Sequence, residues 1–292
     1  MSLSCLFPGQ GSQSKGMGGD LFDRFADWTT AADQTLGYSI RELCLDDPRS
    51  ELGLTQFTQP ALFVVNAMTW RLREQEERTR PDFVAGHSLG EFNALLAAGV
   101  FDFPTGLALV QRRGRIMSAV TGGGMTAVIG LAPDRLEAVL ASSEAGRRLD
   151  VANFNSFEQT VIAGPKEDLD AVRPDLKAAG GRAIPLNVSA PFHSRYMREA
   201  QDEFDAYLAQ FALQPPSIPV VSNVTARPYE ADELRDTLAR QIGSSVRWLD
   251  SMRFLLGRGV TDFEEVGPGK VLTKLVTQIL AASSDRGSAD AR

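Results

Sequence analysis

A serine between two glycines is the first residue whose setting could support covalent chemistry. The segment Gly86-His87-Ser88-Leu89-Gly90 fits the pattern G-x-S-x-G, with an apolar run before it and helical composition after it. In this pattern the serine sits on a strained turn from strand to helix, and the glycines avoid side-chain clashes. We therefore predict a nucleophile at Ser88, the alternative being an ordinary loop. The backbone N–H of Leu89 would then donate to the oxyanion of an attacked carbonyl.

A serine hydroxyl needs a base, and the chain contains only two histidines, His87 and His193. His87 is adjacent to Ser88 on the tight turn, so the backbone directs its ring away from the hydroxyl, and we interpret it as a packing residue. His193 follows a predicted strand and precedes a helical stretch, where a loop can present a base. By elimination we predict that His193 is the base. No acidic residue between Ser88 and His193 stands out as the third member of a triad.

A second glycine-rich turn, FPGQGSQ at residues 7–13, follows the first predicted strand. Two phosphate-binding patterns fail there. The dinucleotide fingerprint would need a third glycine where Ser14 stands, and the Walker pattern would need a glycine before Lys15 at the right spacing. We therefore predict no nucleotide site. We expect the backbone N–H of Gln10 to complete the oxyanion hole from the opposite side of the cleft.

Three arginines, Arg112, Arg113 and Arg115, lie late in an amphipathic helical segment. Basic residues grouped in this way usually form a solvated face of a helix. One of them could instead bind a substrate carboxylate through a bidentate fork, a geometry that lysine does not supply. The spacing does not choose among the three.

Composition limits the class of protein that carries this chemistry. The chain has 292 residues, 43% of them hydrophobic, enough for a large core. A net charge of -7 argues against non-specific nucleic-acid binding, which depends on neutralising phosphates. No apolar run is long enough for a signal peptide or a membrane span, so we expect a cytoplasmic protein. Cys5 and Cys44 show no metal or redox spacing and are expected to be buried thiols.

The elements that must position these residues follow an α/β order. A compact series between residues 122 and 188 reads strand 125–131, helix 133–143, strands 150–153 and 159–163, helix 166–179 and strand 183–188. Around it we expect strands at 3–7, 83–85, 218–222 and 262–266, with helical segments at 21–45, 56–80, 91–98, 232–241, 246–257 and 271–281.

The compact series has the βαββαβ order of the ferredoxin-like split βαβ motif. We therefore predict an inserted subdomain at residues 122–188, entered through a hinge at Gly122-Gly123-Gly124. Residues 1–121 and 189–282 form the main domain in this interpretation. Residues 283–292 are small and polar, and are predicted to be a flexible tail.

Six motifs are spread over nearly the whole chain: FPGQGSQ at 7–13, TQPAL at 58–62, GHSLGE at 86–91, NFNS at 153–156, FHS at 192–194 and EVGPGKVL at 265–272. Their order and spacing resemble those of the malonyl-CoA:acyl-carrier-protein transacylases of fatty-acid and polyketide synthesis. The resemblance implies an α/β-hydrolase-like main domain with an inserted ferredoxin-like subdomain. The sequence around TQPAL and GEFNAL further resembles free-standing acyltransferases that serve polyketide synthases lacking their own.

The resemblance also implies roles for individual residues. The family's carboxylate-binding arginine precedes a glycine and a basic residue, which is the position of Arg113. Its base is oriented by a backbone carbonyl, from a glutamine that resembles Gln241. The oxyanion donors carried over are the N–H groups of Gln10 and Leu89. In modular polyketide acyltransferases a phenylalanine before the base goes with malonyl, because the ring leaves less room for a branching methyl, so Phe192 favours malonyl.

The activity implied by the resemblance is transfer of malonyl from malonyl-CoA to the phosphopantetheine thiol of an acyl carrier protein, through an acyl group on Ser88. An acyl-carrier-protein hydrolase with the same Ser-His pair is the alternative, and a non-catalytic docking protein is another. We expect no cofactor and no metal, since malonyl-CoA is a substrate. The expected partners are malonyl-CoA and an acyl carrier protein. We expect no binding to nucleic acid or to a membrane, and we expect the protein to be a monomer. Arg112 and Arg195 are candidates for docking an acidic carrier.

Overall fold

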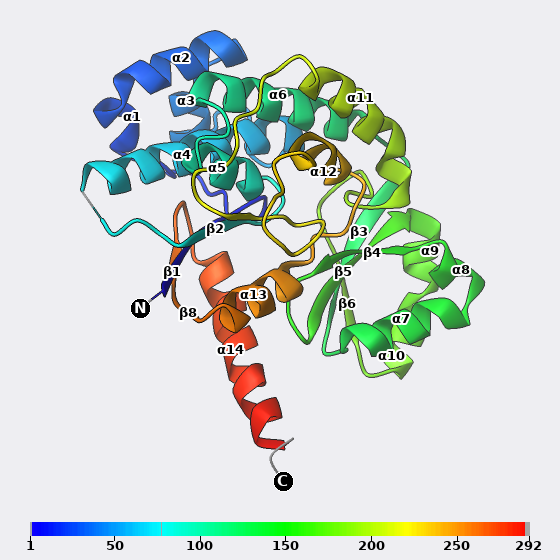
Figure 1. The fold of residues 1–292 in the computed structure, drawn as a ribbon. Coiled ribbons are helices and arrows are strands. Elements are labelled where there is room, and N and C mark those ends of the chain that lie inside the picture. The colour runs from blue at the N-terminus through cyan, green and yellow to red at the C-terminus, as the bar shows by residue number, and fades with distance from the viewer. Residues whose placement is uncertain (1, 77, 290–292) are drawn as a thin grey trace.

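The computed structural model describes residues 2–76 and 78–289, and its strands form two sheets with helices around them (Figure 1). Within these ranges one sheet is parallel, in the order β7-β2-β1-β8, and the other antiparallel, in the order β4-β5-β3-β6. The parallel strands are Ser2–Phe7 (β1), Phe83–Gly86 (β2), Val220–Val221 (β7) and Val260–Glu265 (β8). The antiparallel strands are Gly123–Ile129 (β3), Asp150–Phe154 (β4), Gln159–Pro165 (β5) and Arg182–Pro185 (β6).

The helices fall into two sets along the chain. Between β3 and β6 lie Pro133–Ser142 (α7), Glu144–Arg147 (α8), Lys166–Ala171 (α9) and Arg173–Ala178 (α10). The others precede β3 or follow β6: Leu21–Arg24 (α1), Ala26–Leu36 (α2), Ile40–Leu45 (α3), Thr55–Gln75 (α4), Gly90–Ala97 (α5), Phe103–Ala119 (α6), the 3₁₀ helix Arg195–Met197 (η1), Arg198–Leu208 (α11), Leu234–Arg240 (α12), Trp248–Gly257 (α13) and Val271–Ala289 (α14).

The central strands of the parallel sheet are short apolar runs because helices cover both of their faces. The residues at the carboxyl ends of β1 and β2 are buried. In the register of this sheet Phe7 lies opposite Gly86, and Ala85 lies opposite Val221. The turns after β1, β2 and β7 therefore leave the sheet at the same edge, where ligand sites of open α/β sheets form.

The antiparallel sheet has a hydrophobic core of its own. This core includes the fully buried side chains of Val128, Leu136, Ile162, Val172 and Leu176. The sheet is joined to the rest of the molecule at β4, where the N–H of Val246 donates to Ala152 O at 2.8 Å and the N–H of Phe154 donates to Val246 O at 2.9 Å. The segment before α13 thus fixes one edge of this sheet.

Several predicted boundaries differ from the observed ones. Helix α4 ends at Gln75 rather than near residue 80, where Pro81 disfavours helical backbone before it. Strand β6 ends at Pro185 rather than at residue 188, although the N–H of Leu186 still donates to Met125 O at 2.9 Å. In the expected hinge, Gly123 and Gly124 belong to β3, and only Gly122 has a left-handed backbone, with φ of 86°.

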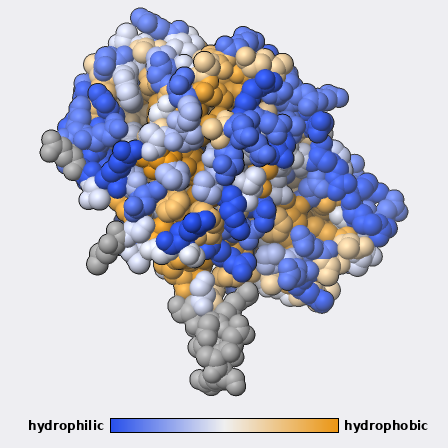
Figure 2. All heavy atoms as spheres, viewed as in Figure 1, coloured by the Kyte–Doolittle hydropathy of each residue, from blue (hydrophilic) through white to orange (hydrophobic). Residues whose placement is uncertain are grey.

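The C-terminal helix α14 continues to Ala289, beyond the predicted end at residue 281. Most of the segment predicted as a flexible tail is therefore helical, and residues 290–292 lie outside the described residues. None of the helices in the described ranges is long and apolar enough to cross a bilayer. Figure 2 shows hydrophilic residues over most of the face in view, with apolar residues reaching the surface mainly in its middle part.

Both cysteines are buried, as predicted, and neither forms a disulfide. Burial raises the pKa of the Cys5 and Cys44 thiols to about 12. A thiol with such a pKa is a poor nucleophile near neutral pH, because the thiolate is the reactive form.

Candidate active site

Ser88 lies on a sharp turn between β2 and α5. Its φ of 51° is in the left-handed region, which is strained for a residue with a side chain. The flanking glycines are required here: a Cβ on Gly86 would lie 1.9 Å from the carbonyl carbon of Gly90, and a Cβ on Gly90 would lie 1.9 Å from Phe7 O. The turn can therefore pack against the end of β1 only with this pair of glycines, and it presents the Ser88 hydroxyl at the sheet edge.

His193 faces Ser88 from the loop before η1. Its Nε2 lies 2.8 Å from Ser88 Oγ, and its Nδ1 lies 2.9 Å from Gln241 O and 3.2 Å from Ser244 O. Two carbonyl acceptors at Nδ1 require the proton on that nitrogen, so the Nε2 lone pair points at the serine. His193 also has a left-handed backbone, with φ of 59°. The imidazole is thus oriented by carbonyls rather than by an acid.

The environment of His193 favours the neutral ring. The side chain is buried, and burial together with the positive charge of Arg113 lowers its pKa to about 3. The bonds from Nδ1 to the two carbonyls act in the opposite direction but are weaker. A neutral imidazole is the form that can accept a proton from a serine hydroxyl.

Arg113 is the one arginine of the predicted cluster that the structure brings to Ser88. It projects from α6, is 1% exposed, and donates from Nη2 to Ser88 Oγ at 3.1 Å and to Gln241 Oε1 at 2.8 Å. Its Nη1 donates to Gln59 Oε1 at 2.7 Å, whereas its buried Nε has no hydrogen-bond partner among the described residues. Burial lowers the pKa of Arg113 to about 10, which leaves the guanidinium charged at neutral pH. A buried cation with a free N–H beside a serine is suited to binding an anion.

A cavity of about 120 Å³ brings most of the predicted site residues together. The backbone N–H groups of Gln10 and Leu89 make no hydrogen bond with the described part of the chain, so both are available at this cavity. Gln241 lies behind the cavity and connects Arg113 to the carbonyl that orients His193. The predicted residues that line the cavity are Gln10, Ser88, Leu89, Arg113, Phe192 and His193, with His87 beside them.

His87 points away from the hydroxyl of the neighbouring serine. Its Nε2 lies 2.8 Å from Asn155 Oδ1, and its ring packs at 5.5 Å from the ring of Trp248. Burial lowers the pKa of this histidine as well. Its contacts connect the elbow to the loop after β4, in keeping with a packing residue.

Sequence reasoning missed two residues that hold the elbow. Asn223, in the turn after β7, accepts the N–H of Ser88 at 2.7 Å and donates to Gly86 O at 2.7 Å. Its place depends on β7 pairing with β2, which no local pattern reveals. Glu91 is fully buried at the start of α5 and accepts from Gln241 Nε2 at 2.5 Å. An acid within the apolar segment GEFNALLA was a readable signal of a buried role.

The Glu91 carboxyl is in a setting that opposes its ionisation. Burial raises its pKa to about 7, against the lowering effect of hydrogen bonds from Tyr229, Gln241 and the Asn223 N–H and of the positive charge of Arg113. The carboxyl accepts all three hydrogen bonds, and in its ionised form its negative charge raises the pKa of Arg113. The two buried charges share Gln241 as a bridge.

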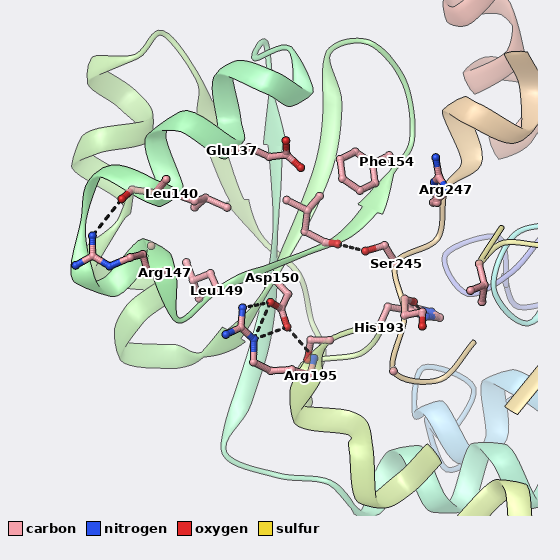
Figure 3. Close-up of a pocket in the computed structure, with 17 residues that line it drawn as sticks. Glu137, Leu140, Arg147, Leu149, Asp150, Phe154, His193, Arg195, Ser245 and Arg247 are labelled. Atoms are coloured by element: carbon pink, nitrogen blue, oxygen red, sulfur yellow. Dashed lines mark hydrogen bonds and ion pairs between the residues drawn. The ribbon is translucent and has the colours of Figure 1, made fainter. Parts of the chain in front are cut away.

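A second, larger hollow of about 930 Å³ lies between α7, β4 and the segment before α13 (Figure 3). It shares only His193 with the smaller cavity and is lined by neither Ser88 nor Arg113. Arg195, at its edge, forms a forked ion pair with Asp150, and Ser245 donates to Val151 O at 2.6 Å. The ion pair ties the chain next to His193 to the antiparallel sheet, and the bond from Ser245 ties the segment before α13 to the same sheet.

Comparison with known proteins gives consistent matches over nearly the whole chain. Residues 5–289 match the acyl transferase domain family. A polyketide biosynthesis malonyl CoA-acyl carrier protein transacylase of Bacillus velezensis is 52% identical over 279 residues, which cover 95% of this chain and 96% of that protein.

Solved structures of similar proteins have the same fold. A malonyl CoA-acyl carrier protein transacylase of Burkholderia pseudomallei has a TM-score of 0.93 at 51% identity, covering 96% of this chain and 98% of that one. A malonyl-transacylase in complex with its type II polyketide synthase acyl-carrier protein has a TM-score of 0.91 at 37% identity, covering 96% and 94%.

Proposed function

The chain belongs to the malonyl-CoA:acyl-carrier-protein transacylases of the acyl transferase domain family, and on this premise we propose that Ser88 carries the acyl group during transfer. The enzyme is an acyltransferase that moves malonyl to an acyl carrier protein. The observation that carries the proposal is the meeting of three groups in one cavity: the Ser88 hydroxyl, the neutral His193 ring at 2.8 Å and the buried Arg113 guanidinium at 3.1 Å.

The first half-reaction follows from this geometry. His193 Nε2 takes the proton of Ser88 as Oγ attacks the thioester carbonyl of malonyl-CoA, and the N–H groups of Gln10 and Leu89 hold the resulting oxyanion. The C–S bond then breaks, and the imidazolium returns its proton to the sulfur of coenzyme A. In the second half-reaction the phosphopantetheine thiol of the carrier gives its proton to His193 and attacks the carbonyl of the acyl-serine. The C–O bond to Ser88 then breaks, and the imidazolium returns the proton to Oγ, which regenerates the Ser88 hydroxyl.

Arg113 supplies the preference for a carboxylated acyl group. Its unpartnered Nε and its Nη2 form one edge of the guanidinium. This edge matches the two oxygens of a malonyl carboxylate that replaces Ser88 Oγ as an acceptor of Nη2, while Gln241 Oε1 keeps the other N–H. Phe192, which is buried in the wall of the same cavity, limits the room for a branched acyl group. The positive charge of Arg113 also lowers the pKa of His193, so a bound carboxylate that neutralises this charge makes the base stronger.

We also propose a finer description of the architecture. The parallel sheet with its helices is an α/β-hydrolase-like main domain of residues 1–121 and 189–282. Residues 122–188 form a ferredoxin-like insert, supported by the antiparallel order β4-β5-β3-β6 and by its separate core.

The proposed partners are malonyl-CoA and an acidic carrier protein. We propose that the enzyme is a monomer and has no resident cofactor. The two arginines considered for docking are exposed at the surface. Arg195 is paired with Asp150, and Arg112 donates to Glu203 at 2.7 Å, so both charges are already balanced within the chain.

Hydrolysis is the competing outcome for the acyl-serine, and one experiment separates the two. The enzyme is mixed with malonyl-CoA and either a phosphopantetheine-bearing carrier protein or buffer alone, and carrier mass and free malonate are followed. We expect malonyl to appear on the carrier much faster than malonate appears in buffer. Release of malonate at the same rate with and without the carrier, with no malonyl-carrier, would assign the site to a hydrolase.

A further inference from the structure

Glu91 is a buried carboxylate that the proposed reaction leaves without a task. It lies in the first turn of α5, three residues after the nucleophile, and has no exposed surface. Its Oε1 accepts from the N–H of Asn223 at 3.0 Å and from the hydroxyl of Tyr229 at 2.7 Å, and its Oε2 accepts from Gln241 Nε2 at 2.5 Å. Burying a charge costs desolvation free energy, which hydrogen bonds offset only in part. A buried carboxylate with three donors therefore indicates a role that depends on its position.

The bond to Gln241 determines which way an amide points. Gln241 Nε2 donates to Glu91 and to Ser88 O, at 2.5 and 2.8 Å, while Gln241 Oε1 accepts from Arg113 Nη2 at 2.8 Å. A carboxylate can only accept and a guanidinium can only donate, so the amide has one orientation that satisfies both neighbours. Glu91 therefore turns the oxygen of Gln241 toward Arg113.

The bond to Asn223 acts on the nucleophile in the same way. By holding the N–H of Asn223, Glu91 fixes the residue whose side chain accepts the N–H of Ser88 and donates to Gly86 O. The side chain of Asn223 thus binds the N–H of Ser88, and the side chain of Gln241 binds its carbonyl. One carboxylate supports the strained elbow from both sides.

We propose that Glu91 is a positioning residue for acyl selection, which sets the amide of Gln241 so that Arg113 is held beside Ser88 in the place where it meets a malonyl carboxylate. The inference rests on the proposed roles of Ser88 and Arg113. Glu91 acts through Gln241 and touches no reacting atom.

The substitution Glu91→Gln replaces one acceptor by a donor with little change of size. Its new amide group faces Gln241 Nε2, so Gln241 must turn over to avoid two opposed donors. The turned Gln241 then presents its amide N–H groups to Arg113, which loses one of its acceptors, and Ser88 O loses its donor. Because one hydrogen bond to a charged group is lost, the ratio of malonyl to acetyl loading should fall about tenfold.

The measurement is kcat/KM for loading from malonyl-CoA and from acetyl-CoA, with thermal unfolding recorded for each variant. Tyr229→Phe is the local control, because it removes one donor from Glu91 but leaves the Gln241 contact, and its ratio should equal that of the wild type. Asp168→Asn is the distant control, because Asp168 is a buried carboxylate on α9 that pairs with Arg148. The double variant Glu91→Gln/Gln241→Glu restores an acceptor for Arg113 and should recover much of the ratio.

A wild-type ratio in Glu91→Gln, including an equal loss for both substrates, would overturn the inference, as would a double variant whose ratio stays as low as that of Glu91→Gln. If Glu91→Gln does not fold, Glu91→Asp is measured instead. It keeps the charge but withdraws the oxygen from Gln241, so a lower ratio is again expected and an unchanged ratio contradicts the inference. Failure of the wild-type enzyme to load malonyl at all would instead contradict the proposed function.

Discussion

The two sheets contribute to the site in different ways. The turns after β1, β2 and β7 of the parallel sheet, together with α5 and α6, supply the charged and hydrogen-bonding groups around Ser88. The antiparallel sheet adds Met125 and Asn153 to the cavity wall and packs a core of its own. The comparison indicates that the chemistry depends on the buried polar network beside the parallel sheet. The antiparallel sheet shapes the cavity wall and is stabilised by a separate apolar core.

Arg113→Ala should have the largest effect on selectivity, because it removes the buried cation from the parallel-sheet side. Charged hydrogen bonds contribute about 1.5–3 kcal/mol each, so malonyl loading should fall by roughly one to two orders of magnitude while acetyl loading is largely spared. Initial rates of loading from the two acyl-CoAs check this below the melting temperature of the variant. Equal losses for both substrates would show that Arg113 does not select the carboxylate.

Leu176→Ala tests the other side of the comparison. Leu176 is fully buried in the core of the antiparallel sheet, so the truncation leaves a cavity that costs about 2–5 kcal/mol of unfolding free energy. Urea unfolding should show this loss, and the ratio of malonyl to acetyl loading should not change for the folded protein. A changed ratio would mean that the packing of this sheet controls selection, and the proposed division between the sheets would be wrong.

Titration of the two histidines gives the smallest but most local signal. Burial lowers the pKa of both rings, that of His193 to about 3, so neither should titrate near 6.5. Because the folded pKa of His193 lies below the unfolded one, the stability that this ring contributes is present above about pH 6.5 and is lost as the pH falls from there toward 3. Ring-proton NMR between pH 7.5 and 5 should show no midpoint for His193 in the folded protein. A midpoint near 6.5 for His193 would contradict its burial beside Arg113.

Much of this arrangement could be predicted from local patterns. The strand, glycine turn and helix around Ser88 are adjacent in the sequence. With only two histidines in the chain, His193 was the one candidate for the base. Choosing Arg113 from its neighbours required the family resemblance, since Arg112 and Arg115 share its helix and charge. The structure brings Arg113 alone of these to the cavity, because only its place on α6 faces the elbow.

The parts that could not be predicted depend on contacts between distant segments. Asn223 reaches Ser88 only because β7 pairs with β2, and Glu91 meets Gln241 only because the end of α12 lies next to the start of α5. The ends of β6 and α14 were not predicted either, because local propensity is a weak guide to where an element ends. Local sequence therefore located the proposed nucleophile better than the network that holds it.

The central claim, that malonyl is carried on Ser88, is tested most directly by the intact mass of the protein after mixing with malonyl-CoA. The wild-type protein should gain the mass of one malonyl group and lose it when a phosphopantetheine-bearing carrier protein is added, with the same group appearing on the carrier. Ser88→Ala should gain nothing. An adduct that persists in Ser88→Ala, or no adduct on the wild-type protein while the carrier becomes malonylated, would contradict the account.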